Sequence, residues 1–301
     1  MPTAESSADE LATLRDLLRF AVSRLTEAGV FFGHGYPDAH TEAAYLLCWA
    51  LHVPHDALDG FLDARATAAE RRRFLALVDR RTTERIPAAY LTQEAWFGDR
   101  RFFVDERVLI PRSFIGDLLQ DGLQPWISDP RSIRRVLDLC TGSGCIAILA
   151  ADAFPEASVD ASDISAGALD VARRNIELHA VTDRVTPVES DLFAALAGRR
   201  YDLIVSNPPY VDAPSMAALP PEYRKEPVGA LGSGEDGLDL THRILAQAAR
   251  HLTPDGLLVV EIGHNRGALE AAHPDTPFVW LDTHAGDEFV FLLNQSDLTS
   301  S

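Results

Sequence analysis

The sequence predicts an α/β protein in which a doubly wound, mostly parallel sheet follows a small helical domain. Apolar residues recur at three- and four-residue steps in residues 1–92, which is typical of amphipathic helices. The period changes to about two from Ala95 to Asp105, which indicates a β-hairpin within a linker at residues 93–112. Residues 113–301 alternate strand-like runs with helical patterns, which is typical of parallel sheets. We therefore expect a helical domain, a linker and an α/β domain.

The N-terminal domain is expected to contain three helices. The first carries an apolar stripe from Leu11 to Leu25 and ends before Gly29. The second opens with Asp38 as its N-cap, and the third covers residues 67–83. The residues that should turn inward on the third helix are Phe74, Leu75, Leu77 and Val78.

The linker and the α/β domain follow in order. Aromatic residues on both sides of Gly98 predict the hairpin, and a helix should start near Ser113. The final apolar run, residues 288–293, is expected to be an edge strand. The other expected strands are Ile133–Leu139, Ser158–Ser162, Arg184–Val188, Tyr201–Ser206 and Gly256–Ile262. The expected helices lie near Cys145–Asp152, Ser165–Ala180 and Gly237–Leu252.

The composition argues against tight binding of nucleic acid. The formal net charge is −18, with 45 acidic and 27 basic residues, and Lys225 is the one lysine. A surface that neutralises phosphates needs clustered Lys and Arg. The acidity disfavours tight nucleic-acid binding and suits a basic protein partner, although negative charge also serves solubility alone.

The cysteines and the N-terminus indicate a reduced, cytoplasmic protein. The three cysteines form no C-x-x-C pair, and the ten His show no metal-ligand spacing, so we expect no metal. Residues 1–10 are polar and acidic, unlike a signal peptide. No apolar run approaches the length of a membrane span, so we expect no membrane partner.

The first strand-to-helix junction carries a glycine turn. Glycines at this place let the backbone turn tightly and approach a ligand at the next helix N-terminus, although a tight turn needs no ligand. The junction reads Asp138-Leu139-Cys140-Thr141-Gly142-Ser143-Gly144-Cys145. Either cysteine could be taken for a nucleophile, but small buried cysteines usually only pack.

Four successive predicted strands end in polar residues, namely Asp138, Asp163, Asp191 and Asn207. The carboxyl ends of parallel strands share one sheet edge, where such folds bind ligands. A carboxylate at Asp163 is placed to accept both hydroxyls of a ribose, while a helix cap is the alternative. Asp191 could accept from an exocyclic amine.

The ligand is expected to be a cationic nucleoside. No G-x-x-x-x-G-K-[ST] motif is present for a polyphosphate, and the acids would repel one. S-adenosylmethionine, whose sulfonium is positive, fits these acids. Leu192 would lie against the purine face. Ile164 is also expected to contact S-adenosylmethionine.

The motif Asn207-Pro208-Pro209-Tyr210 ends the fourth strand. The two prolines lack N–H groups and leave their carbonyls as acceptors. Together with the Asn207 side-chain oxygen they could hold an NH₂ group under an aromatic ring. The alternative is a strand that simply ends in an Asn-Pro turn.

These motifs resemble those of the class I S-adenosylmethionine-dependent methyltransferases, whose fold is Rossmann-like. The Asn207–Tyr210 motif is similar to that of the amino-group methylating branch. The resemblance to the protein-(glutamine-N5) methyltransferases covers nearly the whole chain. It rests on residues 86–91, Val108-Leu109-Ile110-Pro111-Arg112, Glu226-Pro227, the loop Gly234–Asp239, and Glu261-Ile262-Gly263.

Within that branch, one kind modifies release factors and the other modifies the large-subunit ribosomal protein L-three. Two departures from the release-factor kind look like the ribosomal-protein kind: Ser113-Phe114-Ile115-Gly116 follows Arg112 instead of Pro-Glu-Thr-Glu, and Cys140 replaces the first glycine of the cofactor loop. Phe114, where that kind has Pro, is a small departure. The resemblance implies that a basic ribosomal protein, free or in an assembling large subunit, is the substrate, and by analogy that the helical domain docks it.

The implied reaction is transfer of a methyl group to a glutamine amide nitrogen. Asn207 and the Pro208 carbonyl would each accept one N–H of the substrate amide, and Tyr210 would pack over it. Pro111-Arg112 and residues 234–239 are expected at the mouth of the site; the alternatives are an interdomain turn and a helix entry, respectively. Two alternatives stay open: an adenine methyltransferase acting on nucleic acid, and a non-enzymatic assembly factor.

Overall fold

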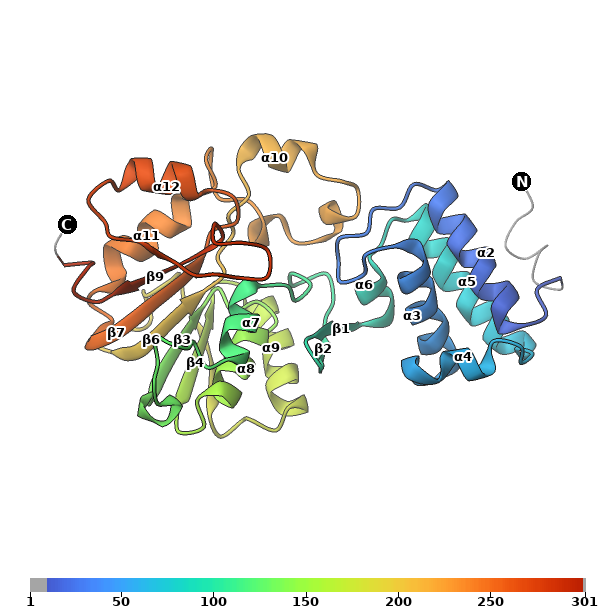
Figure 1. Cartoon of the computed structure of the whole chain (residues 1–301), viewed down its shortest axis with the longest axis horizontal. Coiled ribbons are helices and arrows are strands. Elements are labelled where there is room, and N and C mark those ends of the chain that lie inside the picture. Colours follow the sequence, from blue (N-terminus) through green and yellow to red (C-terminus); the bar gives the residue numbers. More distant parts are fainter. Residues whose placement is uncertain (1–9, 300–301) are drawn as a thin grey trace. The chain divides into compact units, whose positions relative to one another are not determined.

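The computed structural model describes residues 10–299 and divides into two compact units (Figure 1). The first unit consists of the chain up to Glu94 together with Pro220–Lys225. The second unit consists of Ala95–Leu219 and Glu226–Ser301. The assignment of Pro220–Lys225 to the first unit has no counterpart in the sequence pattern.

The first unit is a helical bundle, as predicted. Its main helices are α2 (Leu14–Glu27), α3 (Ala39–Leu51) and α5 (Ala68–Thr83). Thr13 and Thr67 close capping boxes at α2 and α5, and Asp38 caps α3 by accepting from the Thr41 N–H. The four residues expected inward on α5 are buried. The short elements are η1 (His55–Ala57), α4 (Leu58–Phe61) and α6 (Ala88–Thr92).

The second unit is built on a seven-stranded sheet with the order β5-β4-β3-β6-β7-β9-β8. The strands β3 (Arg135–Leu139), β4 (Ser158–Asp163), β5 (Val185–Glu189), β6 (Tyr201–Ser206) and β7 (Leu252–Glu261) are parallel, and β9 (Val290–Asn294) is antiparallel to β7. Strand order reverses at β3, between β4 and β6, which is where such sheets form a ligand crevice. The predicted doubly wound fold is confirmed.

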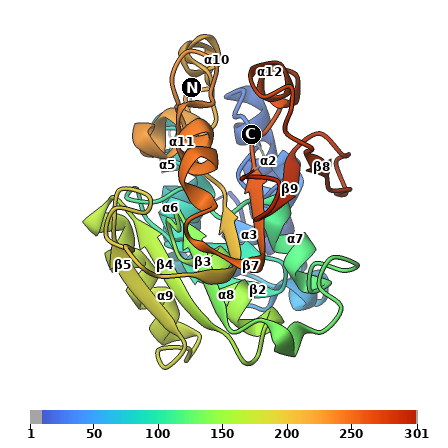
Figure 2. The ribbon, with the colours of Figure 1, turned by 90° about the vertical axis from the view of Figure 1, so that its left-hand side faces the viewer.

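Helices cover both faces of this sheet (Figure 2). Alternate β3 residues face opposite sides: Val136 packs with α7 (Phe114–Gln120) and α8 (Cys145–Ala153), and Leu137 packs with α11 (Asp239–Ala248). Helix α9 (Ala166–Leu178) shares the face of α8, and α12 (Arg266–Ala272) shares that of α11. Both faces of the sheet are therefore covered by helices and shielded from water, which explains why the strands are continuous apolar runs.

Two sequence predictions about the C-terminal strands and α11 were wrong in detail. The last apolar run is not the edge strand, because β8 (Val279–Trp280) lies outside β9. A two-residue strand carries no periodic signal. Helix α11 ends at Ala248 rather than Leu252, because Leu252 already pairs with Tyr201 in the sheet.

The hairpin of β1 (Glu94–Phe97) and β2 (Arg100–Phe103) is confirmed and lies against α9. The buried Asn175 accepts from the Phe103 N–H at 2.7 Å and donates to the carbonyls of Phe103 and Ser143, both at 2.9 Å. One α9 side chain thus ties the hairpin to the glycine turn. The remaining short elements are α10 (Ala213–Ala218), η2 (Pro130–Ser132), η3 (Tyr223–Lys225) and η4 (Val228–Ala230).

Within residues 10–299, none of the helices combines the length and apolarity that crossing a bilayer requires.

Candidate active site

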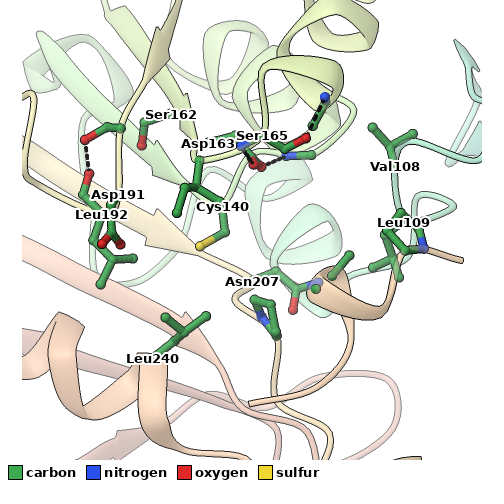
Figure 3. Close-up of a pocket in the computed structure, with 18 of the residues that line it drawn as sticks. Val108, Leu109, Cys140, Ser162, Asp163, Ser165, Asp191, Leu192, Asn207 and Leu240 are labelled. Atoms are coloured by element: carbon green, nitrogen blue, oxygen red, sulfur yellow. Dashed lines mark hydrogen bonds between the residues drawn. The ribbon is translucent and has the colours of Figure 1, made fainter. Parts of the chain in front are cut away.

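A cavity of about 420 Å³ lies at the carboxyl ends of β3, β4, β5 and β6 (Figure 3). This volume falls in the range of roughly 300–1,000 Å³ typical of small-molecule sites. The predicted residues that line it are Cys140, Gly142, Asp163, Ile164, Asp191, Leu192, Asn207 and Pro209. The sheet edge thus brings together residues far apart in sequence, as expected from the strand ends.

The glycine turn has left-handed backbone angles at three places. Cys140, Gly142 and Gly144 have φ values of 60°, 55° and 80°. A Cβ on Gly144 would lie 3.2 Å from the Ala172 side chain of α9, so this glycine allows close helix packing. Burial raises the pKa of the Cys140 thiol, which disfavours the thiolate form that a nucleophile needs.

Asp163 holds the turn and faces the cavity. One carboxylate oxygen accepts from the Gly142 N–H and the other from the Ser165 N–H, each at 2.9 Å. Ser165, not Asp163, is the N-cap of α9. Burial raises the pKa of Asp163. Because each oxygen has a second lone pair, the carboxylate can still accept from a ligand.

Asp138 lies behind the turn rather than in the cavity. It is fully buried and accepts from the Thr141 hydroxyl at 2.5 Å. Burial raises the pKa of this carboxyl to about 7. Three other residues expected at the ligand also do not line the cavity: Thr141, Ser143 and Gly144. Their backbone shapes the turn instead.

Asp191 lies at the rim of the cavity, half-exposed, in an ion pair with Arg243 of α11 at 2.8 Å. The next residue, Leu192, is buried with a φ of 47°, which turns the chain so that its side chain lines the cavity. An exposed ion pair of this kind contributes little to stability, roughly 0–1 kcal/mol. Asp191 is therefore available to a ligand at small cost.

The side chain of Asn207 is oriented by the carbonyl of Arg112, whose guanidinium pairs with the buried Glu226. Its Nδ2 donates to the Arg112 carbonyl at 3.3 Å, which directs Oδ1 away from that contact. The Arg112 guanidinium binds Glu226 through two bonds of 2.7 and 2.6 Å, and Glu226 also accepts from the Ile110 N–H at 3.0 Å. Arg112 thus supports Asn207 from outside the cavity, where the sequence placed Pro111-Arg112 at its mouth.

Tyr210 does not line the cavity and is held from behind by Glu261. The Tyr210 hydroxyl donates to Glu261 Oε1 at 3.2 Å, while Oε2 accepts from the Ser113 hydroxyl at 2.6 Å and the Phe114 N–H at 2.9 Å. A Cβ on Gly263 would come within 2.7 Å of the Tyr210 ring. Glu261 therefore joins the end of β7, the start of α7 and the motif. Pro208 also lies outside the cavity lining.

Glu261 should make stability depend on pH. Burial raises its pKa from 4.5 to about 7, so unfolding releases its proton between these values and stability falls as pH rises. The loss amounts to about 3 kcal/mol for one such carboxyl. We expect Glu261→Gln to lose less unfolding free energy than the wild type between pH 5 and pH 8, as measured by urea unfolding. The exposed Glu235→Gln should keep the wild-type dependence; equal pH dependence in both variants would contradict the assignment.

Several cavity residues were missed as ligand contacts in the sequence. Val108 and Leu109 belong to a stretch quoted only for its resemblance, and Leu240 follows the 234–239 loop, which itself does not line the cavity. The others are Arg107, Ser162, Ser165, Ala168, Ser190, Pro227, Gly229, Ala230 and Arg243. Most of these residues lie in turns or next to predicted residues, where hydrophobic periodicity gives no signal. No cluster of metal-ligating side chains occurs in the described part of the chain.

Comparison with known proteins identifies the family. Residues 122–218 match the model of the methyltransferase small domain, and residues 16–92 match the PrmC N-terminal domain. The chain is 56% identical over 292 residues to the ribosomal protein uL3 glutamine methyltransferase of Neisseria gonorrhoeae, covering 97% of each chain. It is 56% identical over 291 residues to that of Bordetella pertussis, covering 97% of this chain and 98% of the relative.

A solved structure of the hMettl16 catalytic domain with the MAT2A 3′UTR hairpin 1 shares the fold, with a TM-score of 0.53 at 17% identity over 84% of this chain and 91% of that one. The fold and the domain models define a methyltransferase. The chain belongs to the family of ribosomal protein uL3 glutamine methyltransferases. The predicted family is confirmed.

Proposed function

We propose that this enzyme transfers a methyl group from S-adenosylmethionine to the side-chain amide nitrogen of a glutamine in ribosomal protein uL3. The choice of uL3 as the substrate rests on one observation. The chain is 52–56% identical, over nearly its whole length, to proteins named ribosomal protein uL3 glutamine methyltransferase. The cavity at the sheet edge, with Asp163 and Asn207 in its lining, supports the chemistry. The cytoplasm is the proposed location, because ribosomal proteins are made there.

The residues of the cavity fit S-adenosylmethionine. When bound, this cofactor supplies an electrophilic methyl group on a sulfonium. The free lone pairs of the Asp163 carboxylate would accept the ribose hydroxyls. Leu192 and Ile164 offer apolar surface to the adenine, and Asp191 an acceptor for its amine.

Asn207 is proposed to orient the substrate amide. The amide nitrogen is a poor nucleophile, because its lone pair is delocalised into the carbonyl. Two acceptors, Asn207 Oδ1 and the Pro208 carbonyl, would each take one N–H and aim the lone pair at the methyl group. The bond from Asn207 Nδ2 to the Arg112 carbonyl supports this role, since it leaves Oδ1 as the acceptor. Alignment of two reactants is worth up to roughly 7–11 kcal/mol.

The first unit is proposed to dock the substrate protein. This role is supported by the match of residues 16–92 to the PrmC N-terminal domain. Docking is separate from the chemistry of the catalytic cavity. When purified uL3 is added to the full-length Asn207→Ala variant, we expect slower amide hydrogen exchange at exposed positions of α2, α3 or α5. Protection confined to the second unit would reject the docking role.

A substrate comparison tests the proposed function. The protein is incubated with labelled S-adenosylmethionine and purified uL3, a release factor or total RNA. We expect label in uL3 that resists nuclease and maps to a glutamine. Label that enters the release factor faster would favour that substrate, and nuclease-sensitive label would favour an adenine methyltransferase. No transfer to any of them would favour the non-enzymatic alternative.

A further inference from the structure

The Asn207–Tyr210 motif is held at both of its ends by residues of the second unit. At the first end, Asn207 Nδ2 donates to the Arg112 carbonyl at 3.3 Å. At the other end, Asn265 Nδ2 donates to the Tyr210 carbonyl at 2.7 Å. A carbonyl oxygen only accepts, so the nitrogen of the Asn265 amide is the atom that faces it. Because the two prolines between these ends have fixed φ angles, few backbone torsions of the motif remain free.

The peptide unit that follows Tyr210 is bonded on both sides. Its carbonyl accepts from Asn265, and its N–H, which belongs to Val211, donates to the Leu231 carbonyl at 2.8 Å. The Tyr210 side chain is bonded separately, through its hydroxyl, to Glu261. Loss of the Asn265 bond would therefore release one side of this peptide unit while the tyrosine ring keeps its own bond.

Gly237 makes room for the bond between Asn265 and Tyr210. This glycine has a φ of 78°, which lies in the left-handed region. A Cβ at this position would overlap the Tyr210 carbonyl oxygen and would lie 2.7 Å from Asn265 Nδ2. Every residue other than glycine carries a Cβ and would displace this bond. The 234–239 loop, which does not line the cavity, is thus fitted to the backbone of the motif.

Asn265 stands at the N-cap of α12, but its side chain does not cap that helix. An asparagine at this position usually accepts from the N–H of the second or third helical residue. Among the described residues, no N–H of α12 bonds to the Asn265 side chain, and the amide is directed at the motif instead. The effect of replacing this side chain should therefore come through Tyr210 rather than through α12.

We propose that Asn265 is a positioning residue for methyl transfer. Its bond to the Tyr210 carbonyl fixes the second half of the motif, and through the prolines it keeps the Pro208 carbonyl in place as an acceptor for the substrate amide. This inference rests on the proposed function, which gives Pro208 that role. Neither Asn265 nor Tyr210 lines the cavity, so the effect falls on orientation of the substrate amide and not on cofactor binding.

Asn265→Asp tests this role, because it keeps a favoured N-cap residue of the same shape while a carboxylate cannot donate to a carbonyl. Misplacement by about 1 Å can cost about a hundredfold in rate, so we expect kcat with uL3 to fall about 10- to 100-fold. The amide hydrogen of Val211 should exchange at least about fivefold faster, because its peptide unit opens more often. Calorimetry should give a dissociation constant for S-adenosylhomocysteine within about twofold of the wild type, since the cavity lining is untouched.

Asn294→Asp is the matched control. It makes the same change where Nδ2 donates to Asp297 at 3.2 Å, opposite Leu257 and so at the other end of β7 from Glu261. Both variants lose one hydrogen bond and gain one negative charge. Only Asn265→Asp should lower kcat and speed exchange at Val211. The proposal is overturned if Asn265→Asp keeps the wild-type kcat, whether or not exchange at Val211 changes, or if the control loses as much activity.

Asn265→Ser keeps the test decisive if Asn265→Asp does not fold. Serine is also a favoured N-cap and adds no charge, and its hydroxyl ends one atom short of the position of Nδ2. We expect kcat to fall about tenfold with cofactor affinity unchanged. A wild-type kcat in this variant would overturn the proposal. Failure of the wild type to methylate uL3 would contradict the proposed function instead, and unchanged exchange at Val211 in the Asn265 variants would still show that Asn265 does not fix the motif.

Discussion

Replacing Asn207 by Ala is expected to lower kcat for glutamine methylation by at least about a hundredfold. The substitution removes the acceptor that orients the substrate amide and stabilises the charge that develops on its nitrogen. Removal of a single preorganised polar group of this kind costs roughly 10²–10³ in kcat. The dissociation constant for S-adenosylmethionine should stay within about tenfold, because Asp163 and the glycine turn are untouched. Single-turnover kinetics with uL3 and calorimetry with the cofactor measure the two quantities.

Asn294→Ala is the control for this experiment. It makes the same amide-to-methyl change at the end of β9, where the exposed Asn294 side chain donates to Asp297. We expect its kcat to equal that of the wild type. Near-normal turnover in Asn207→Ala would reject the role proposed for the motif, and an equal loss of cofactor affinity and turnover would make Asn207 a cofactor contact only.

Replacing Asp163 by Asn should weaken S-adenosylmethionine binding by about a hundredfold or more. Hydrogen bonds to a charged group contribute about 1.5–3 kcal/mol each, and the proposal gives Asp163 two of them with the ribose. The new NH₂ group would also face the N–H of Gly142 or Ser165, both of which need an acceptor. At saturating cofactor, kcat should fall by less than about tenfold, because Asp163 does not touch the substrate amide in the proposed arrangement.

Asp160→Asn in the same strand separates this effect from damage to β4. Asp160 accepts from Arg199 at 2.8 Å and from the Tyr201 hydroxyl at 2.7 Å, away from the cavity lining. Its replacement should lower the unfolding free energy without changing the cofactor dissociation constant. If both variants bind the cofactor as the wild type does, Asp163 is only a support of the glycine turn.

The sequence by itself determined the order of the elements and the edge of the sheet that carries the cavity. Strand ends at Asp163, Asp191 and Asn207 could be predicted because a parallel strand is marked by its own apolar run. Once the strands are parallel, their carboxyl ends must meet at one edge. The local hydrophobic periodicity and the residue types at turns were therefore sufficient to predict the fold and most of the predicted cavity residues.

Only the tertiary structure decided which polar groups face the cavity and which support it from behind. Asp138 turned out to lie beneath the glycine turn, and Tyr210 to be bound to Glu261 behind the motif. The pairs that orient the site join residues far apart in the chain, such as Arg112 and Glu226, separated by 114 positions. No local pattern encodes such a pair, because it forms only when packing has already brought two loops together and buried the Glu226 carboxylate.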